Sequence, residues 1–346
     1  MAVFRGYQKG VNLGGWLSQC VSYDREHFTG FITEQDIARI SGWGMDHVRL
    51  PVDVDVIETD RGEIREDGYA YIENCVRWCR KYGLNLVLDL HKAHGFMFDT
   101  NVVSDPDRFF TDEHLQEMFI ATWEKLILRF GKDKDIVAFE LLNEVVNPAY
   151  EAKWNGIASR AIRCIRSHES DAVIIVGGVR HNSVVSVPGI APEQLKDGNL
   201  VLNFHCYEPL CFTHQHAYWV ENTDYDLPYP APLGLYEEKS RALNQDQTCL
   251  YFSGCKGEIG PDYFETLFRD AVSYADSLGL PLYCGEYGVI DRAALEDSVR
   301  WIRDINSVFD RYGIGRALWN YKEKDFGMIG PHYAPGFDEL IGILAR

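Results

Sequence analysis

The chain has 346 residues and a formal net charge of −18, and 46% of its residues are hydrophobic. This composition fills a large folded core, so it excludes a disordered chain. The acidity argues against nucleic acid and against an anionic membrane surface as partners, because both are bound through basic faces. A neutral or cationic ligand fits better, although solubility alone also accounts for the acidity.

The nine cysteines are odd in number and show no regular spacing. This pattern predicts buried, reduced thiols rather than a disulfide framework, and hence a reducing compartment. The first residues, "MAVFRGYQKGVNLGGW", contain no apolar signal core, and no apolar run reaches the length of a membrane span. We therefore expect a cytoplasmic protein, or a secreted one if the chain was trimmed.

Eight short apolar runs follow one another along the chain and read as strands. They cover residues 9–13, 46–51, 84–91, 136–144, 172–178, 199–208, 280–288 and 316–322. Amphipathic segments separate most of them and predict helices over 33–44, 69–83, 112–131, 152–168, 262–279 and 295–313. The fifth unit is the weakest, because only "RHNSVVSV" stands between its strand and the next, so its helix should be short or irregular.

Near-continuous apolar strands that alternate with helices indicate a parallel sheet covered by helices. Eight such units predict a closed (β/α)8 barrel in a single domain over residues 1–346. The alternative is an open doubly wound sheet, but "VNLGGW" lacks the glycine spacing that a phosphate-binding turn needs. Residues 207–260 form a long connection after the sixth strand. We expect an extended loop or small subdomain there, at the C-terminal face of the barrel.

The strand ends carry the residues suited to chemistry, and in a barrel they share one face. They are Asn12, Arg49, Asp89, His91, Asn143, Glu144, His205, Tyr207, Glu286 and Trp319. Each residue alone is explained as a satisfied structural group, but their convergence on one face favours an active site. Glu144 and Glu286 follow the fourth and seventh strands. Glycoside hydrolysis requires such a pair, with one carboxylic acid to protonate the leaving oxygen and one carboxylate to attack or to activate water.

With these residues in view, the sequence resembles glycoside hydrolase family 5, the cellulase and β-mannanase family of the large barrel clan. The resemblance covers nearly the whole chain. It rests on seven motifs in order: "KGVNLGGW" (9–16), "HVRLPVD" (47–53), "LDLHKAHG" (88–95), "ELLNEVVNP" (140–148), "NFHCYEP" (203–209), "GEYG" (285–288) and "LWNYKEKDFG" (318–327). The family's usual signature has proline directly after the acid glutamate. Here Val145 stands in that place and Pro148 comes later, so the path of this loop differs from the family pattern.

The resemblance implies that Glu144 is the general acid/base and Glu286 the nucleophile of a retaining reaction. A raised pKa would keep Glu144 protonated at rest, and Arg49 and Tyr207 would favour the charged form of Glu286. Asn143 would bind the sugar 2-OH. His91 and His205 would bind hydroxyls or orient a glutamate, and Trp319 would form the floor under the cleaved sugar.

Two further features of the sequence need an interpretation. Glu140 lies inside the fourth strand, and we interpret it as a buried structural partner of Arg49 or of another donor at the strand ends, rather than as the acid. The segment "HCYEPLCFTHQHAYW" (205–219) is rich in His and Cys, but its spacing does not match a zinc site. We expect no metal and no cofactor. We expect His214, His216 and Trp219 to line sugar subsites, with ordinary loop packing as the alternative.

The sequence therefore predicts a retaining glycoside hydrolase that cleaves β-glucosidic linkages in glucans or gluco-oligosaccharides. A β-mannosidase or β-mannanase with the same residues is the first alternative, because a few hydrogen bonds decide the sugar. A non-catalytic carbohydrate-binding barrel and a zinc hydrolase are more remote alternatives. Linkage, endo or exo action and oligomeric state are not decided by the sequence.

Overall fold

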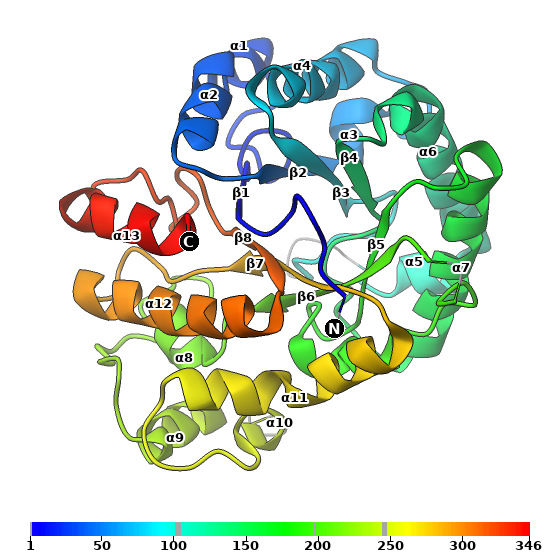
Figure 1. Ribbon diagram of the computed structural model, residues 1–346. Coiled ribbons are helices and arrows are strands. Elements are labelled where there is room, and N and C mark those ends of the chain that lie inside the picture. The colour runs from blue at the N-terminus through cyan, green and yellow to red at the C-terminus, as the bar shows by residue number, and fades with distance from the viewer. Residues whose placement is uncertain (1, 101–104, 197, 244–247) are drawn as a thin grey trace.

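The computed structural model describes residues 2–100, 105–196, 198–243 and 248–346. Eight parallel strands pair in chain order and close into a barrel, which Figure 1 shows from one end with helices around it. The strands are β1 (Gly10–Asn12), β2 (His47–Asp53), β3 (Asn85–Lys92), β4 (Val137–Glu140), β5 (Ile174–Gly177), β6 (Leu200–Cys206), β7 (Leu282–Tyr287) and β8 (Gly315–Leu318). The predicted (β/α)8 barrel is confirmed, and the open doubly wound sheet is excluded.

Six long helices lie where the amphipathic segments predicted them, within three residues at each end. They are α2 (Glu34–Gly42), α4 (Glu66–Tyr82), α6 (Glu113–Phe130), α7 (Glu151–His168), α11 (Pro261–Leu278) and α12 (Leu295–Tyr312). Glycine ends several of these helices, as is common at helix C-termini. For example, α4 stops at Gly83, which adopts a left-handed conformation with φ of 70°.

Shorter elements lie between and after the strands and long helices. The short helices are α1 (Arg25–Gly30), α3 (Val54–Ile57), α5 (Arg108–Thr111) and α13 (Phe337–Leu344), and the 3-10 turns are η1 (Gly131–Asp133), η2 (Pro148–Tyr150), η3 (Val184–Gly189) and η4 (Ala334–Gly336). Among the described residues between β5 and β6, the 3-10 segment η3 is the only regular element, so the fifth unit has the irregular connection that its sequence predicted.

The connection after β6 folds back over one side of the barrel. Residues 207–260 contain α8 (Leu210–Thr213), α9 (Leu233–Leu243) and α10 (Thr248–Phe252). Figure 1 shows these helices beside α11 and α12. This segment therefore has helical structure of its own.

The barrel interior is layered, because strand side chains alternate between the two faces of the sheet. At the N-terminal end, an apolar cluster contains Phe4, Tyr7, Val87, Ala138, Ile175, Val201, Tyr283 and Ala317. Two residues further along β3, β4 and β6, the inward positions become polar at Asp89, Glu140 and Asn203, all buried. The barrel is thus closed by apolar packing at one end and carries polar chemistry at the other.

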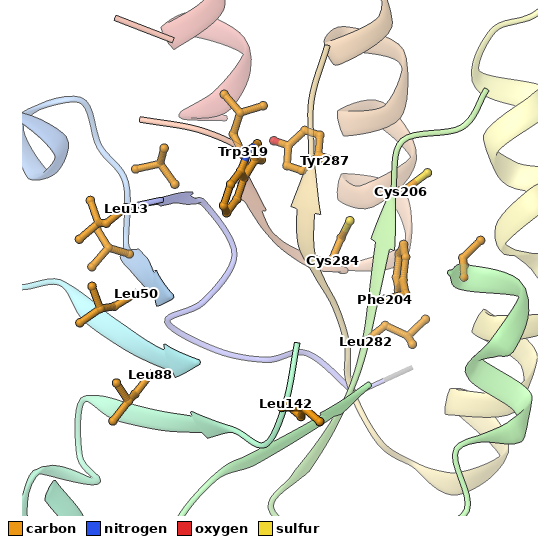
Figure 2. Packing of buried hydrophobic residues seen from close by; sticks show 14 of the residues in the cluster. Leu13, Leu50, Leu88, Leu142, Phe204, Cys206, Leu282, Cys284, Tyr287 and Trp319 are labelled. Atoms are coloured by element: carbon orange, nitrogen blue, oxygen red, sulfur yellow. The ribbon is translucent and has the colours of Figure 1, made fainter. Parts of the chain in front are cut away.

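The outward faces of the strands pack against the helices. Their apolar side chains form a second, larger buried cluster, and Figure 2 shows Leu50, Leu88, Phe204 and Leu282 within it. Since this core lies outside the barrel, the strand ends are free to carry polar groups.

In the part of the chain that the structure describes, no helix is both long enough and apolar enough to cross a membrane. The eight cysteines with described side chains are free thiols, five of them buried.

Candidate active site

Glu144 and Glu286 meet at the C-terminal mouth of the barrel. Glu144 lies just beyond β4 and Glu286 lies in β7. One oxygen of each carboxyl group and a ring nitrogen of His205 all lie within 4.8 Å of one another. Retaining glycosidases hold their carboxyl groups about 5–5.5 Å apart, whereas inverting enzymes need about 6.5–9.5 Å to admit a water. The spacing here suits direct attack by one carboxylate.

Arg49, fully buried on β2, ties the site together. Its Nε and Nη2 donate to the two oxygens of Glu140 at 2.7 and 2.9 Å, which confirms Glu140 as its structural partner. Nη1 donates to Glu286 Oε1 at 2.7 Å, and Nη2 lies 3.0 Å from Asp89 Oδ2. Burial lowers the pKa of Arg49, but these carboxylates outweigh it and raise the pKa well above its usual value. The guanidinium is therefore a permanent cation under the site.

Hydrogen bonds orient the groups around Arg49. Arg49 also donates to Asn12 Oδ1 and to Asn143 Oδ1, each at 3.0 Å. Asn203 Nδ2 donates to Glu140 Oε1 at 2.8 Å. Each amide side chain is consequently held in one orientation.

Tyr207 completes the contacts of Glu286. Its hydroxyl donates to Glu286 Oε2 at 3.0 Å, so Glu286 accepts one hydrogen bond on each oxygen. Burial, followed by the charges of Glu286 and Glu144, raises the pKa of Tyr207 well above its usual value. Tyr207 therefore remains a hydrogen-bond donor.

The environment of Glu144 corrects one expectation. Burial raises its pKa, but hydrogen bonds from His181 and His205 outweigh burial and hold the pKa below the usual range. His205 Nδ1 donates to Oε1 at 2.8 Å, and His181 Nδ1 lies 3.4 Å from Oε2. The raised pKa predicted for Glu144 at rest is therefore wrong, because two imidazoles flank the carboxyl group.

Trp319 and His91 form a stacked pair at the mouth. Their ring centroids lie 6.0 Å apart with planes 8° apart, and His91 Nδ1 donates to Asp89 Oδ2 at 2.7 Å. Gly14 approaches the indole so closely that a Cβ there would lie 2.5 Å from Trp319 Cη2. Asn320 fixes this approach, accepting from Gly14 N and donating to Gly14 O at 2.9 Å each. Gly14 of "VNLGGW" thus leaves room for the indole of Trp319.

A cavity of about 1080 Å³ opens over the two carboxylates. Residues that line it include Glu144, Glu286, His205, Tyr207 and Trp319, and also His214, Tyr218 and Trp219 from the 207–260 segment. Ligand pockets commonly measure about 300–1,000 Å³. The site therefore has room for more than one sugar.

The structure does not bring His216 into this cavity. Its ring lies between Asp224 and Asp226, at 3.1 and 3.0 Å, within the same segment. These ion pairs raise the pKa of His216 and hold the ring in the loop, so the expectation of a sugar contact is not met. His214, by contrast, packs edge-on against Tyr207 at the cavity wall, and burial lowers its pKa to about 4.

Sequence reasoning missed His181. It follows β5, where the sequence carries no family motif, and its backbone N donates to Val145 O at 3.1 Å. Val145 is the residue that replaces the usual proline, so this departure from the pattern lies next to the missed residue. Glu144 itself has a φ of 24°, an uncommon value for a residue with a side chain and one found preferentially at functional sites.

Comparison with known proteins gives a consistent result. The family model described as "Cellulase (glycosyl hydrolase family 5)" matches residues 7–325. Cellodextrinase A of Ruminococcus flavefaciens is 43% identical over 314 residues, covering 90% of this chain and 84% of the relative. Endoglucanase C of Acetivibrio thermocellus is 37% identical over 346 residues, covering 98% of both chains.

Solved structures share the fold at lower identity. Endoglucanase Cel5A of Thermotoga maritima superposes with a TM-score of 0.76 and 20% identity, covering 98% of this chain and 97% of that one. The cellulose synthase subunit Z of Clostridioides difficile has the same TM-score of 0.76 at 21% identity, covering 98% and 100%.

Proposed function

This chain belongs to glycosyl hydrolase family 5 and is a retaining hydrolase of β-glucosidic linkages; we propose that Glu144 and Glu286 carry out its chemistry on soluble β-1,4-linked gluco-oligosaccharides. The observation that carries the assignment is the carboxylate pair, with oxygens within 4.8 Å at the mouth of the barrel. The pair meets the distance requirement of double displacement.

In the first half of the reaction, a Glu286 oxygen attacks the anomeric carbon while Glu144 donates a proton to the leaving glycosidic oxygen. Arg49 and Tyr207 hold Glu286 by one hydrogen bond on each oxygen, which aims the carboxylate and limits its motion. The product is a glycosyl ester on Glu286, and the leaving sugar departs with the proton of Glu144.

In the second half, the ionised Glu144 takes a proton from a water that attacks the same anomeric carbon. The ester bond to Glu286 breaks, and both carboxyl groups return to their starting states. Glu144 must therefore act once as an acid and once as a base. The two imidazoles beside it favour its ionised form, which is the form that the second half requires.

Neighbouring side chains suit sugar binding. Trp319 offers an indole face to the apolar C–H side of the cleaved sugar. Asn143, whose Oδ1 is taken by Arg49, is positioned to bind the 2-OH with its amide NH2 group. His91 supports Trp319 by stacking, and His214 and Trp219 extend the wall of the cavity toward more distant sugars.

Two observations support oligosaccharides as the substrates. The cavity of about 1080 Å³ accepts several sugar units, and the 207–260 segment contributes part of its wall. Cellodextrinase A, 43% identical, is named for action on short cello-oligosaccharides.

The test is a hydrolysis screen in which products are sized. It compares aryl β-glucoside, aryl β-cellobioside and aryl β-mannoside with cello-oligosaccharides of increasing length, β-1,3-linked oligosaccharides and insoluble cellulose. We expect the highest kcat/KM for soluble β-1,4-linked cello-oligosaccharides and no turnover by Glu286→Ala, which should still bind them. Preference for the β-mannoside, for β-1,3 linkages or for insoluble cellulose would contradict the substrate assignment. Binding without hydrolysis by the wild-type chain would point to a carbohydrate-binding barrel.

A further inference from the structure

His181 contacts the proposed acid/base from a loop that lies outside the family motifs. Its Nδ1 lies 3.4 Å from Glu144 Oε2, and its side chain is 56% exposed and lines the cavity. His205 contacts the other oxygen, Oε1, at 2.8 Å and is buried. The two oxygens of Glu144 thus face one buried and one accessible imidazole.

An unusual backbone places His181 there. Arg180, His181 and Asn182 have φ values of 58°, 54° and 57°, three consecutive left-handed residues that all carry side chains. The left-handed conformation is strained for a residue that has a Cβ, so such runs persist only where the surroundings hold them.

Three hydrogen bonds hold this turn. His181 N donates to Val145 O at 3.1 Å, His205 N donates to Asn182 O at 2.7 Å, and Gly178 N donates to Asn182 Oδ1 at 2.9 Å. The turn is therefore joined to β6, next to His205, and to the segment that follows Glu144. Strain held in place by contacts to the site is typical of a functional segment.

We propose that His181 is a positioning residue that sets the proton affinity of Glu144, by holding a titratable ring against the oxygen opposite His205. This inference rests on the proposed function, which makes Glu144 the acid/base. When protonated, the ring stabilises the Glu144 carboxylate, the base of the second half-reaction. When neutral, it allows Glu144 to retain the proton needed in the first half.

The electrostatics agree with this geometry. Burial lowers the pKa of His181, but Glu144 and then Asp99 outweigh burial and raise it above its usual value. The titratable groups that face the pair are Asp99, His205, Tyr207, Glu208, His214 and Glu286. An opposite charge within a few ångströms shifts a carboxyl pKa by about 1–3 units. Because the ring of His181 is exposed to solvent, its effect should lie at the lower end of this range. Removing it should raise the pKa of Glu144 by about one unit.

The test compares pH profiles of kcat/KM on cellotetraose. His181→Asn removes the titratable ring, and asparagine tolerates the left-handed backbone. In the profile of His181→Asn, we expect the basic limb, which reports the acid Glu144, to move up by about one pH unit. The acidic limb, which reports the nucleophile Glu286, should stay in place. His181→Lys keeps a cation and should keep the basic limb near that of the wild type. Thermal unfolding checks that each variant is folded.

His216→Asn is the matched control. His216 also has a left-handed φ, of 58°, and also pairs with carboxylates, but it lies away from the cavity. Its profile should overlay that of the wild type. The inference is overturned if His181→Asn lowers the rate without moving the basic limb, or if both limbs move together.

Glu144→Gln separates the acid/base role of Glu144 from the positioning role of His181. If it keeps wild-type hydrolysis, the acid/base assignment itself fails; if it is inactive and the His181→Asn profile is unshifted, only the role of His181 fails.

Discussion

Replacing Arg49 with methionine should destabilise the fold strongly and in a pH-dependent way. Methionine keeps an apolar stem of similar length, but the variant loses the cation that contacts Asp89, Glu140 and Glu286 at 2.7–3.0 Å. Removing one partner of a buried ion pair costs about 3–5 kcal/mol, because the other charge stays buried. Because three carboxylates are left without the cation, we expect a loss of unfolding free energy near the upper end of this range, about 5 kcal/mol at pH 8.

The pH dependence follows from the protons that the stranded carboxyl groups bind. The pKa of Glu140 is already raised, by burial first and also by Asp89, even with Arg49 present. In the variant, the folded chain therefore holds more protons than the unfolded chain at neutral pH, so its stability rises as pH falls. As pH falls, the loss of unfolding free energy should shrink by about 1.4 kcal/mol per pH unit for each carboxyl that stays protonated in the folded variant. This trend should continue until the pH reaches the ordinary carboxyl pKa of about 4.

The assay is denaturant unfolding at pH 5 and pH 8, with Arg316→Met as the matched control. Arg316 is also a buried arginine, but its ion-pair partner Asp310 is 44% exposed and can rehydrate. We expect a control loss of about 1–3 kcal/mol that changes little with pH. Equal losses for the two variants, or an Arg49→Met loss that is the same at both pH values, would show that stranded buried carboxylates do not cause the destabilisation.

Three further predictions concern activity. Glu144→Ala should lower kcat/KM on cello-oligosaccharides by about 10²–10⁴-fold, yet lower the glycosylation rate much less for an aryl glycoside with an activated leaving group, as pre-steady-state kinetics would measure. Gly14→Ala should lower kcat/KM by about tenfold or more, because the new methyl group forces the Trp319 indole to move. Gly42→Ala, whose added Cβ has no atom within 4 Å apart from its chain neighbours and the backbone of its own helix, should match the wild type. Treatment with a metal chelator should leave initial rates unchanged, since double displacement needs only the two carboxyl groups; loss of rate restored by zinc would favour the metal alternative.

Much of the barrel was predictable because each strand and helix carries its own local signal. The apolar runs predicted the eight strands, and the amphipathic segments located the long helices within three residues at each end. The gap after β5 was also visible in the sequence. Glu144, Glu286 and Arg49 were predictable as neighbours because the ends of parallel strands meet at one face of a barrel.

The rest depends on loop conformation and on groups far apart in sequence. His181 lies on a left-handed turn that no residue pattern announces, and it overturned the predicted pKa direction of Glu144. His216 carries the same residue type as His214, but nearby aspartates hold it away from the cavity. Composition of the 207–260 segment could not separate these two histidines, because only the fold of that segment decides which one faces the sugar.

The most direct test of the account is to trap the nucleophile. An activated 2-deoxy-2-fluoro cellobioside slows both half-reactions but slows breakdown of the ester more, so the glycosyl-enzyme accumulates. Intact mass and peptide mapping then locate the label. We expect one fluorocellobiosyl group per chain, attached to Glu286. A label on Glu144 or Glu140, or full turnover of natural substrate by Glu286→Ala, would contradict it.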